Sequence, residues 1–142
     1  MNYSQLRVGN YLLACGEIAK LLAIDTSNHT IDIAAISTPE ILKTVCVSEA
    51  GYITLIKDLL TQCCGFTDIH YGCILHAGKY ELLYREHARN ELILMHEASR
   101  PLIYFWDIKS LHQLQNLYHQ FKGGELEINS ALIGAPGMTE RS

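Results

Sequence analysis

The stretch that decides the fold most clearly is Ser110-Leu111-His112-Gln113-Leu114-Gln115-Asn116-Leu117-Tyr118-His119-Gln120-Phe121-Lys122-Gly123. Its large apolar residues recur every three or four positions, which predicts one amphipathic helix. They are Leu111, Leu114, Leu117, Tyr118 and Phe121. Ser110 can cap the start of this helix, with Asp107 as the alternative, and Gly123-Gly124 ends it after Lys122.

The opposite side of this predicted helix is rich in amides and imidazoles. Such a face is normally solvated, but it can also form a partner surface, because amides and imidazoles hydrogen-bond without a large charge desolvation cost. We predict four partner-binding residues on it: His112, Gln115, Asn116 and His119. His112 and His119 are seven positions apart, about 10 Å along a helix axis, so they cannot hold one metal ion together.

Ahead of this helix, four extended segments predict a four-stranded antiparallel meander. They are residues 69–76, 79–85, 91–97 and 102–106, with breaks short enough for hairpins. We expect the closing helix to lie across one face of this sheet. The run 85–91 mixes charges of both signs and is predicted to be a solvated hairpin tip. The aromatic pairs Tyr80 with Tyr84 and Tyr104 with Trp106 each share a strand face, which is typical of core or cross-strand packing.

The first part of the chain alternates short apolar runs with turn residues. It predicts strands over 8–14, 17–24, 30–36 and 41–47, with turns at Cys15-Gly16 and over 25–29. Four such short strands predict a small, strongly bent antiparallel sheet, of the SH3-like barrel type.

A first helix is predicted between these two parts. Its apolar face consists of Leu55, Ile56, Leu59, Leu60 and Cys63. Gly65 would end it in a left-handed conformation, with Phe66 folding back on the last turn. Its start is open, since Ser48 could cap it but Gly51 weakens a helix that begins so early.

These elements define an α+β fold in one compact unit. We predict a small β lobe over 1–48, an α+β lobe over 49–130 and a flexible tail over 131–142. A chain of 142 residues can bury enough surface to fold without a metal or a disulfide.

Composition excludes several classes of function. The formal net charge is −4 and the 11 basic residues are scattered, which argues against nucleic-acid binding, since that draws on clustered Lys and Arg. The N-terminus lacks the pattern of a signal peptide, and no apolar run approaches the ~20 residues of a membrane helix. Five cysteines without framework spacing indicate free thiols in a reducing compartment. The sequence therefore predicts a cytoplasmic protein that binds neither membrane nor nucleic acid.

The cysteines and histidines could bind a metal or act in catalysis, but their spacing in the sequence matches no such site. The set Cys63, Cys64, His70, Cys73 and His76 has zinc-ligand chemistry. However, neighbouring cysteines on a helix diverge by about 100°. Cys73 would also face away from both histidines on a strand over 69–76. We therefore predict no metal site, no cofactor and no catalytic residue. Cys73 with a neighbouring histidine is the least weak nucleophile candidate, although no local motif selects it.

Three segments carry a resemblance to a known group of proteins. They are Leu6-Arg7-Val8-Gly9-Asn10, the stretch from His112 to Tyr118 and Gly123-Gly124-Glu125-Leu126, with a weaker match at Cys64-Gly65-Phe66. In these segments the chain resembles uncharacterised small proteins of phages, prophages and mobile elements from Bacteroidota-type gut bacteria. The resemblance implies a phage-linked, cytoplasmic origin, and it implies no activity and no catalytic residue.

These observations favour a non-catalytic protein-binding or regulatory module. In the concrete form of this hypothesis, the chain docks on a host or phage protein, for example to inhibit a bacterial defence system. It would use the polar face of the closing helix or the open face of the meander. Two alternatives remain. One is a small enzyme with an unrecognised Cys/His site, and the other is a self-associating structural phage component with an exposed sheet edge.

Overall fold

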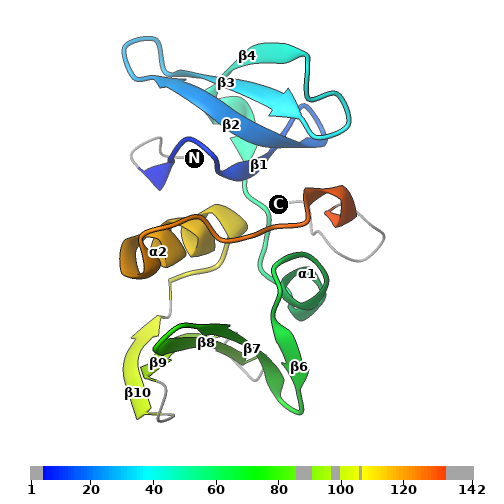
Figure 1. Ribbon diagram of the computed structural model, residues 1–142. Helices are drawn as coiled ribbons and strands as arrows, with labels where there is room; N and C mark the ends of the chain where they lie inside the picture. Colours follow the sequence, from blue (N-terminus) through cyan, green and yellow to red (C-terminus); the bar gives the residue numbers. More distant parts are fainter. Residues whose placement is uncertain (1–4, 86–90, 97–99, 106, 134–142) are drawn as a thin grey trace.

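The computed structural model describes residues 5–85, 91–96, 100–105 and 107–133, which form three layers (Figure 1). One antiparallel sheet comes from the first part of the chain and a second from the later part. Two helices lie between these sheets in Figure 1. The fold is therefore α+β, as the sequence predicts.

Five strands form the first sheet in the order β4-β3-β2-β1-β5. They are β1 (Tyr11–Ala14), β2 (Glu17–Asp25), β3 (Thr30–Ala35), β4 (Leu42–Cys46) and β5 (Ala50–Gly51), with the 3-10 helix η2 (Val47–Glu49) before the last. Cys15 and Gly16 form the predicted turn, and both have positive φ, 53° and 76°, as a two-residue hairpin between twisted strands requires. The sheet extends past residue 48, the predicted end of the β lobe, because β5 returns to pair with β1.

Helix α1 (Lys57–Cys63) buries Leu59, Leu60 and Cys63 of the predicted apolar face, whereas Leu55 and Ile56 precede the helix. Gly65 has a φ of 77°, and the N–H of Phe66 donates to the carbonyl of Leu60 at 3.1 Å. This closure across Gly65 is the expected left-handed helix stop, and it places the Phe66 ring in the core. Ser48 does not cap α1, since it belongs to η2 and the helix begins only at Lys57.

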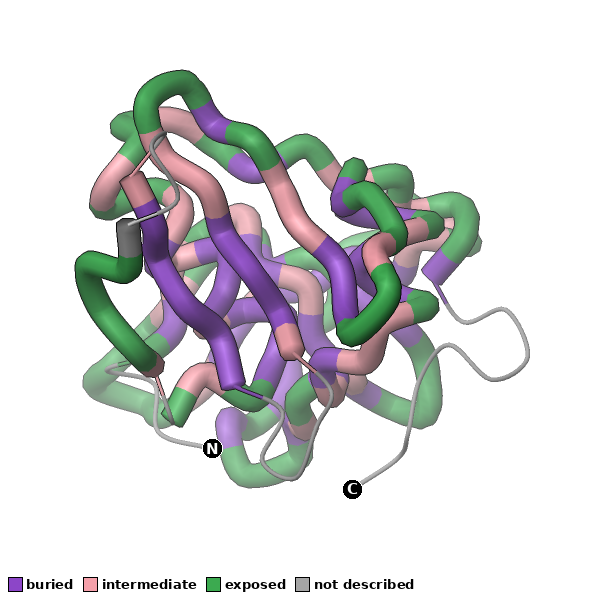
Figure 2. The backbone as a smooth tube through the Cα atoms, turned by 90° about the horizontal axis from the view of Figure 1, so that it is seen from below, coloured by how far each residue is buried: buried purple, intermediate pink, exposed green. Residues whose placement is uncertain are grey.

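The second sheet has five strands, each antiparallel to its neighbour in the chain, in the order β10-β9-β8-β7-β6. They are β6 (Thr67–Ile69), β7 (Gly72–Ala77), β8 (Tyr80–Arg85), β9 (Glu91–His96) and β10 (Arg100–Phe105). Figure 2, seen from the side of this sheet, shows buried positions along its central strands β8 and β9. Residues 86–90 of the predicted hairpin tip and Trp106 lie outside the described residues.

The single strand expected over 69–76 is wrong, because the chain reverses at His70 and Tyr71. Ile69 pairs with Gly72 across this turn, which makes β6 a separate short strand. Gly72 permits the close approach of the next strand, since a Cβ there would lie 1.9 Å from the carbonyl oxygen of Tyr84. The uninterrupted apolar pattern hides this turn, and His70 and His76 do not share a strand face.

Helix α2 (Leu111–Lys122) has the predicted ends. Ser110 is the N-cap, and Oε1 of Gln113 accepts its backbone N–H at 3.1 Å, whereas Asp107 takes no part in the cap. Gly123 ends the helix with a φ of 76°. The residue ahead of the helix is tied to the chain before α1, since the N–H of Leu55 donates to the carbonyl of Lys109 at 2.9 Å.

The main hydrophobic core lies between the helices and the second sheet, and a smaller one lies within the first sheet. The segment after α2 returns to the larger core, where Leu126 and Ile133 are buried. The N–H of Asn129 donates to the carbonyl of Cys63 at 2.8 Å, just before the 3-10 helix η3 (Ser130–Leu132). The tail predicted to be flexible from residue 131 therefore begins as a packed segment, and residues 134–142 lie outside the described part of the chain.

Candidate functional site

The segment before β1 packs against α2 through a polar, largely buried contact. Asn116 lies at its centre: its Oδ1 accepts hydrogen bonds from Nδ2 of Asn10 at 2.9 Å and from Nε of Arg7 at 3.2 Å. The Nδ2 of Asn116 donates to the carbonyl of Gln5 at 2.8 Å. Asn10 is fully buried, and its Oδ1 accepts the backbone N–H of Arg7 at 2.7 Å. The amide groups thus replace the water they lose on burial with protein partners.

Gln115 forms a second part of this contact. Its Oε1 accepts the backbone N–H of Tyr11 at 2.9 Å, and its Nε2 donates to the carbonyl of Gly9 at 3.1 Å. Gly9 has a φ of 100°, a conformation that glycine adopts readily. One buried side chain on α2 therefore binds the backbone on both sides of Asn10, at the start of the first sheet.

Arg7 extends the contact to the segment after α2. Its guanidinium pairs with both carboxylate oxygens of Glu125, one of them through Nη2 at 3.0 Å. The hydrogen bond from Arg7, together with the positive charge, holds the pKa of Glu125 below its ordinary value. The planar fork of arginine suits this two-point contact, and its Nε remains available for Asn116.

The three segments that carry the resemblance therefore meet in space. We call the contact of Arg7, Asn10, Gln115, Asn116 and Glu125 the end-to-end network. The sequence prediction included Gln115 and Asn116 but missed Arg7, Asn10 and Glu125. No spacing rule connects residues this far apart in the chain. The only available signal was that all three segments belong to the recognised motifs.

Two of the four predicted partner-binding residues do not lie on a solvated face, since His112 and Gln115 are only 3% and 2% exposed. The reason is that α2 is covered on two sides, by the second sheet and by the segment before β1, which leaves a narrow strip exposed. The Nδ1 of His112 lies 3.1 Å from Oγ of Ser110. Burial lowers the pKa of His112 to about 4, so its ring is neutral at neutral pH.

The exposed strip of α2 borders a groove of about 510 Å³, which we call the α2 groove. Its walls combine polar and apolar side chains from three segments: Gln113, Asn116, Leu117, His119 and Gln120 of α2, Gln5, Leu6 and Arg7, and Phe105, Asp107 and Ile108. A smaller hollow of about 290 Å³ shares Gln5, Asp107 and Gln113 with it and includes His112. Three of the four predicted site residues thus line adjoining cavities, while Gln115 faces the first sheet.

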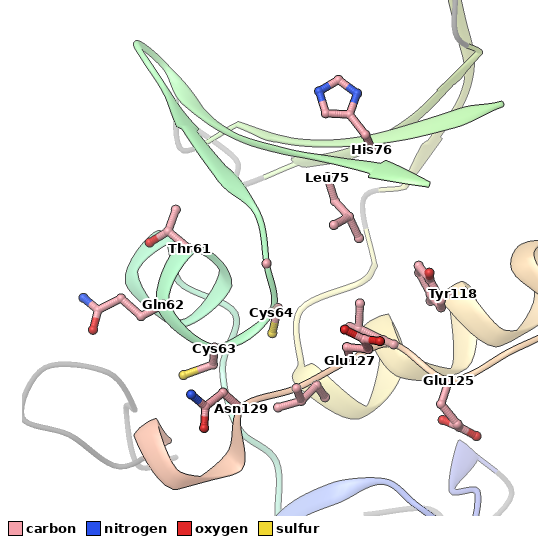
Figure 3. Close-up of a pocket in the computed structure, with 13 residues that line it drawn as sticks. Thr61, Gln62, Cys63, Cys64, Leu75, His76, Tyr118, Glu125, Glu127 and Asn129 are labelled. Carbon is pink, nitrogen blue, oxygen red and sulfur yellow. The ribbon is translucent and has the colours of Figure 1, made fainter. Parts of the chain in front are cut away.

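A larger cavity, of about 720 Å³, lies between α1, β7, α2 and the segment after α2 (Figure 3). Cys63, Cys64 and Leu75 line one part of it, and Tyr118 lines another. Figure 3 shows His76 on the opposite side of the sheet from Cys64, and Nδ1 of His76 pairs with Oε2 of Glu81 at 2.8 Å. Burial raises the pKa of Cys64 to about 12, so this thiol stays protonated. The cavity brings no thiolate and histidine base together.

The other cysteine and histidine candidates are dispersed in a similar way. Cys73 is completely buried in the main core. Within the described ranges, no three His, Cys, Asp or Glu side chains come together in a group that could hold a metal ion. All five cysteines lie in the described part of the chain, and none of them forms a disulfide.

The fold and these cavities define a small α+β protein with two antiparallel sheets, in which a polar contact joins the start of the first sheet to helix α2. Comparison of the chain with protein-family models, curated proteins and solved structures found no match. Among the described residues, no helix is long and apolar enough to cross a membrane.

Proposed function

We propose that this protein is a non-catalytic binding module and that the α2 groove holds an extended segment of a partner protein. The observation that carries this proposal is the position of His119 and Gln120. Both side chains are exposed on the groove wall, and neither side chain makes a hydrogen bond to the described part of the chain. Their polar groups are therefore available to a ligand.

The composition of the groove supports a peptide as this ligand. Leu6, Phe105 and Leu117 offer apolar contacts, and the amides and imidazoles beside them can donate to and accept from a peptide backbone. Arg7 is already paired with Glu125, which leaves Asp107 as the other charged residue of the groove wall. We expect the bound segment to be mainly apolar and uncharged polar, with a basic residue favoured near Asp107.

A matched pair of substitutions tests this proposal. Gln120→Arg places a bulky charge on the groove wall, whereas Gln62→Arg makes the same change at an exposed position of α1 outside the groove. A photo-crosslinking residue at position 119 should capture a partner from native cells, and Gln120→Arg should abolish this capture. Gln62→Arg should leave it unchanged. Equal capture by both variants, or capture of nothing but the chain itself, would contradict the proposal.

We further propose that the first sheet is a small barrel of the SH3-like type. Its strand order, in which β5 returns to β1 after a 3-10 turn, supports this proposal. A cytoplasmic location is likewise a proposal, supported by five cysteines without a disulfide in the described chain.

Two further proposals rest on the resemblance of the three motif segments. The first is that the protein comes from a phage, prophage or mobile element. The second is that it inhibits a host defence system, as one form of partner binding. The genes that neighbour the encoding gene test both. Capsid, replication or counter-defence genes are expected there, and housekeeping genes alone would argue against this origin.

A further inference from the structure

The smaller hollow beside the α2 groove lies at the start of α2. It has a volume of about 290 Å³, and it shares Gln5, Asp107 and Gln113 with the groove. Its other lining residues are Tyr52, Lys109, Ser110 and His112. Cavities that hold a whole small molecule usually measure about 300–1,000 Å³, so this hollow has room for one side chain. A segment bound in the groove can therefore place one of its side chains in the hollow.

His112 supplies this hollow with a polar atom that has no partner. The residue is 3% exposed, and its one side-chain hydrogen bond in the described part of the chain joins Nδ1 to Oγ of Ser110 at 3.1 Å. Two fully enclosed side-chain atoms lack a partner among the described residues, namely Oε1 of Glu81 and Nδ1 of His96. Nε2 of His112 is not one of them, so it reaches solvent, and the hollow is the cavity that His112 lines.

The hydrogen bonds around Ser110 decide which ring nitrogen of His112 carries the hydrogen. Oε1 of Gln113 accepts the backbone N–H groups of Lys109 at 2.8 Å and of Ser110 at 3.1 Å, which occupies both of its lone pairs. The Ser110 hydroxyl lies 3.0 Å from this oxygen and 3.1 Å from Nδ1 of His112. Only Nδ1 still has a lone pair for the hydroxyl hydrogen. The neutral ring of His112 therefore carries its own hydrogen on Nε2, as a donor toward the hollow.

The charges of the hollow favour an uncharged side chain as its ligand. Lys109 and Asp107 contribute one charge of each sign, and the ring of His112 is neutral at neutral pH, so the wall has no net charge. An apolar side chain would leave the N–H of His112 without an acceptor. A primary amide carries an acceptor oxygen and an NH₂ donor on separate atoms, which lets it contact His112 and the carboxylate of Asp107 at once.

We propose that the smaller hollow binds an asparagine or glutamine side chain of the partner segment. The amide oxygen accepts the Nε2–H of His112, and the NH₂ group donates to Asp107. This inference rests on the proposed function, because the amide reaches the hollow from a segment bound in the α2 groove. Asp107 lines both cavities, so its second carboxylate oxygen remains available to a basic residue in the groove.

Peptide selection with the wild-type protein tests the inference without a change at His112. The bait is the full-length chain, and the ligands are a displayed library of random peptides. Peptides that Gln120→Arg no longer binds are those held in the α2 groove, and we expect them to share one asparagine or glutamine. Replacement of this residue by leucine in a selected peptide should weaken binding at least about tenfold, since the N–H of His112 loses its acceptor.

Two substitutions of His112 then assign the amide to the hollow. His112→Leu removes the donor, whereas His112→Gln restores an N–H donor near the position of Nε2. We expect His112→Leu to bind the amide peptide and its leucine version equally well, and His112→Gln to prefer the amide again. The imidazole ¹⁵N signals of the wild type give the same information if a variant fails to fold. The Nε2–H signal of His112 should shift with the amide peptide and remain in place with the leucine version.

The outcomes separate this inference from the proposed function. If no selected peptide depended on Gln120, the α2 groove would fail as the binding site, and the inference would fail with it. Peptides that depend on Gln120 but share a hydroxyl, charged or apolar residue in place of the amide would overturn the inference alone. An amide preference that His112→Leu leaves unchanged, or an Nε2–H signal that does not respond, would also overturn only the inference.

Discussion

Replacement of Gln115 by leucine should weaken the attachment of the first sheet to α2. Gln115 is almost fully buried, and it supplies an acceptor to Tyr11 and a donor to Gly9. Leucine has a similar size but offers neither group. The substitution therefore leaves a backbone N–H and a backbone carbonyl without their partner while it fills most of the space.

The expected loss follows from these two groups. A buried polar group that loses its only partner costs about 1–3 kcal/mol. Both groups lie near the surface of the first sheet, where partial access to water reduces the penalty, so we expect a total loss of about 2–4 kcal/mol. A loss of this size is a large part of the stability of an ordinary small domain, which is about 5–15 kcal/mol.

Equilibrium unfolding in urea, followed by circular dichroism, measures this loss. The control is Gln120→Leu, the same change at an exposed position of the same helix, which should alter stability by no more than about 0.5 kcal/mol. Hydrogen exchange should also become faster at the amide of Tyr11. If Gln115→Leu and Gln120→Leu changed stability equally, the buried amide contact would not be holding the first sheet.

Three further predictions concern other parts of the molecule. Burial lowers the pKa of His112 to about 4, below the ordinary value near 6.5. Between pH 6.5 and pH 4 the imidazole of His112 is therefore protonated in the unfolded chain and neutral in the folded chain. The free energy of unfolding falls as the pH falls through this window. From pH 7 to pH 5 the loss in the free energy of unfolding that His112 causes is about 2 kcal/mol. Urea unfolding at pH 7 and at pH 5 should show a smaller loss of stability for His112→Asn than for the wild type. Gly72→Ala should cost at least about 3 kcal/mol, because its Cβ would meet the carbonyl of Tyr84, while Gly124→Ala, with no atom within 4 Å, should be nearly neutral in thermal unfolding. A thiol reagent followed by mass spectrometry should label the exposed Cys15 and Cys46 quickly, and Cys63, Cys64 and Cys73 only after unfolding. Rapid labelling of a buried cysteine in the folded chain would revive the enzyme alternative.

Sequence patterns predicted a helix or strand well where all the residues that determine it are close together in the chain. Helix α2 follows from its apolar stripe, its N-cap at Ser110 and the left-handed Gly123, all of which are local in the chain. The strand expected over 69–76 failed because apolar periodicity does not register a two-residue turn, and the requirement for Gly72 comes from a neighbouring strand. Sequence reasoning detects local structure, whereas the reversal at His70 and Tyr71 depends on tertiary contact.

The candidate site depends even more on contacts between segments that are distant in the chain, which local sequence does not predict. The amide side of α2 was recognisable from residue type, but which of its members remain exposed depends on what covers the helix. Gln115 is covered by the first sheet, while His119 lies one turn further on and stays exposed. No local property of the stretch 112–119 distinguishes these outcomes, because the covering residues come from the opposite end of the chain.

The end-to-end network and the α2 groove are physically connected through Asn116. Its side chain is fixed by Arg7, Asn10 and Gln5, and it also forms part of the groove wall. Arg7 and Gln5 line the groove as well. The groove therefore exists before a partner binds, and binding loses little conformational entropy at these residues. This connection separates two effects of mutation. Changes in the network, such as Gln115→Leu, should reduce both stability and partner binding, whereas Gln120→Arg should reduce binding alone.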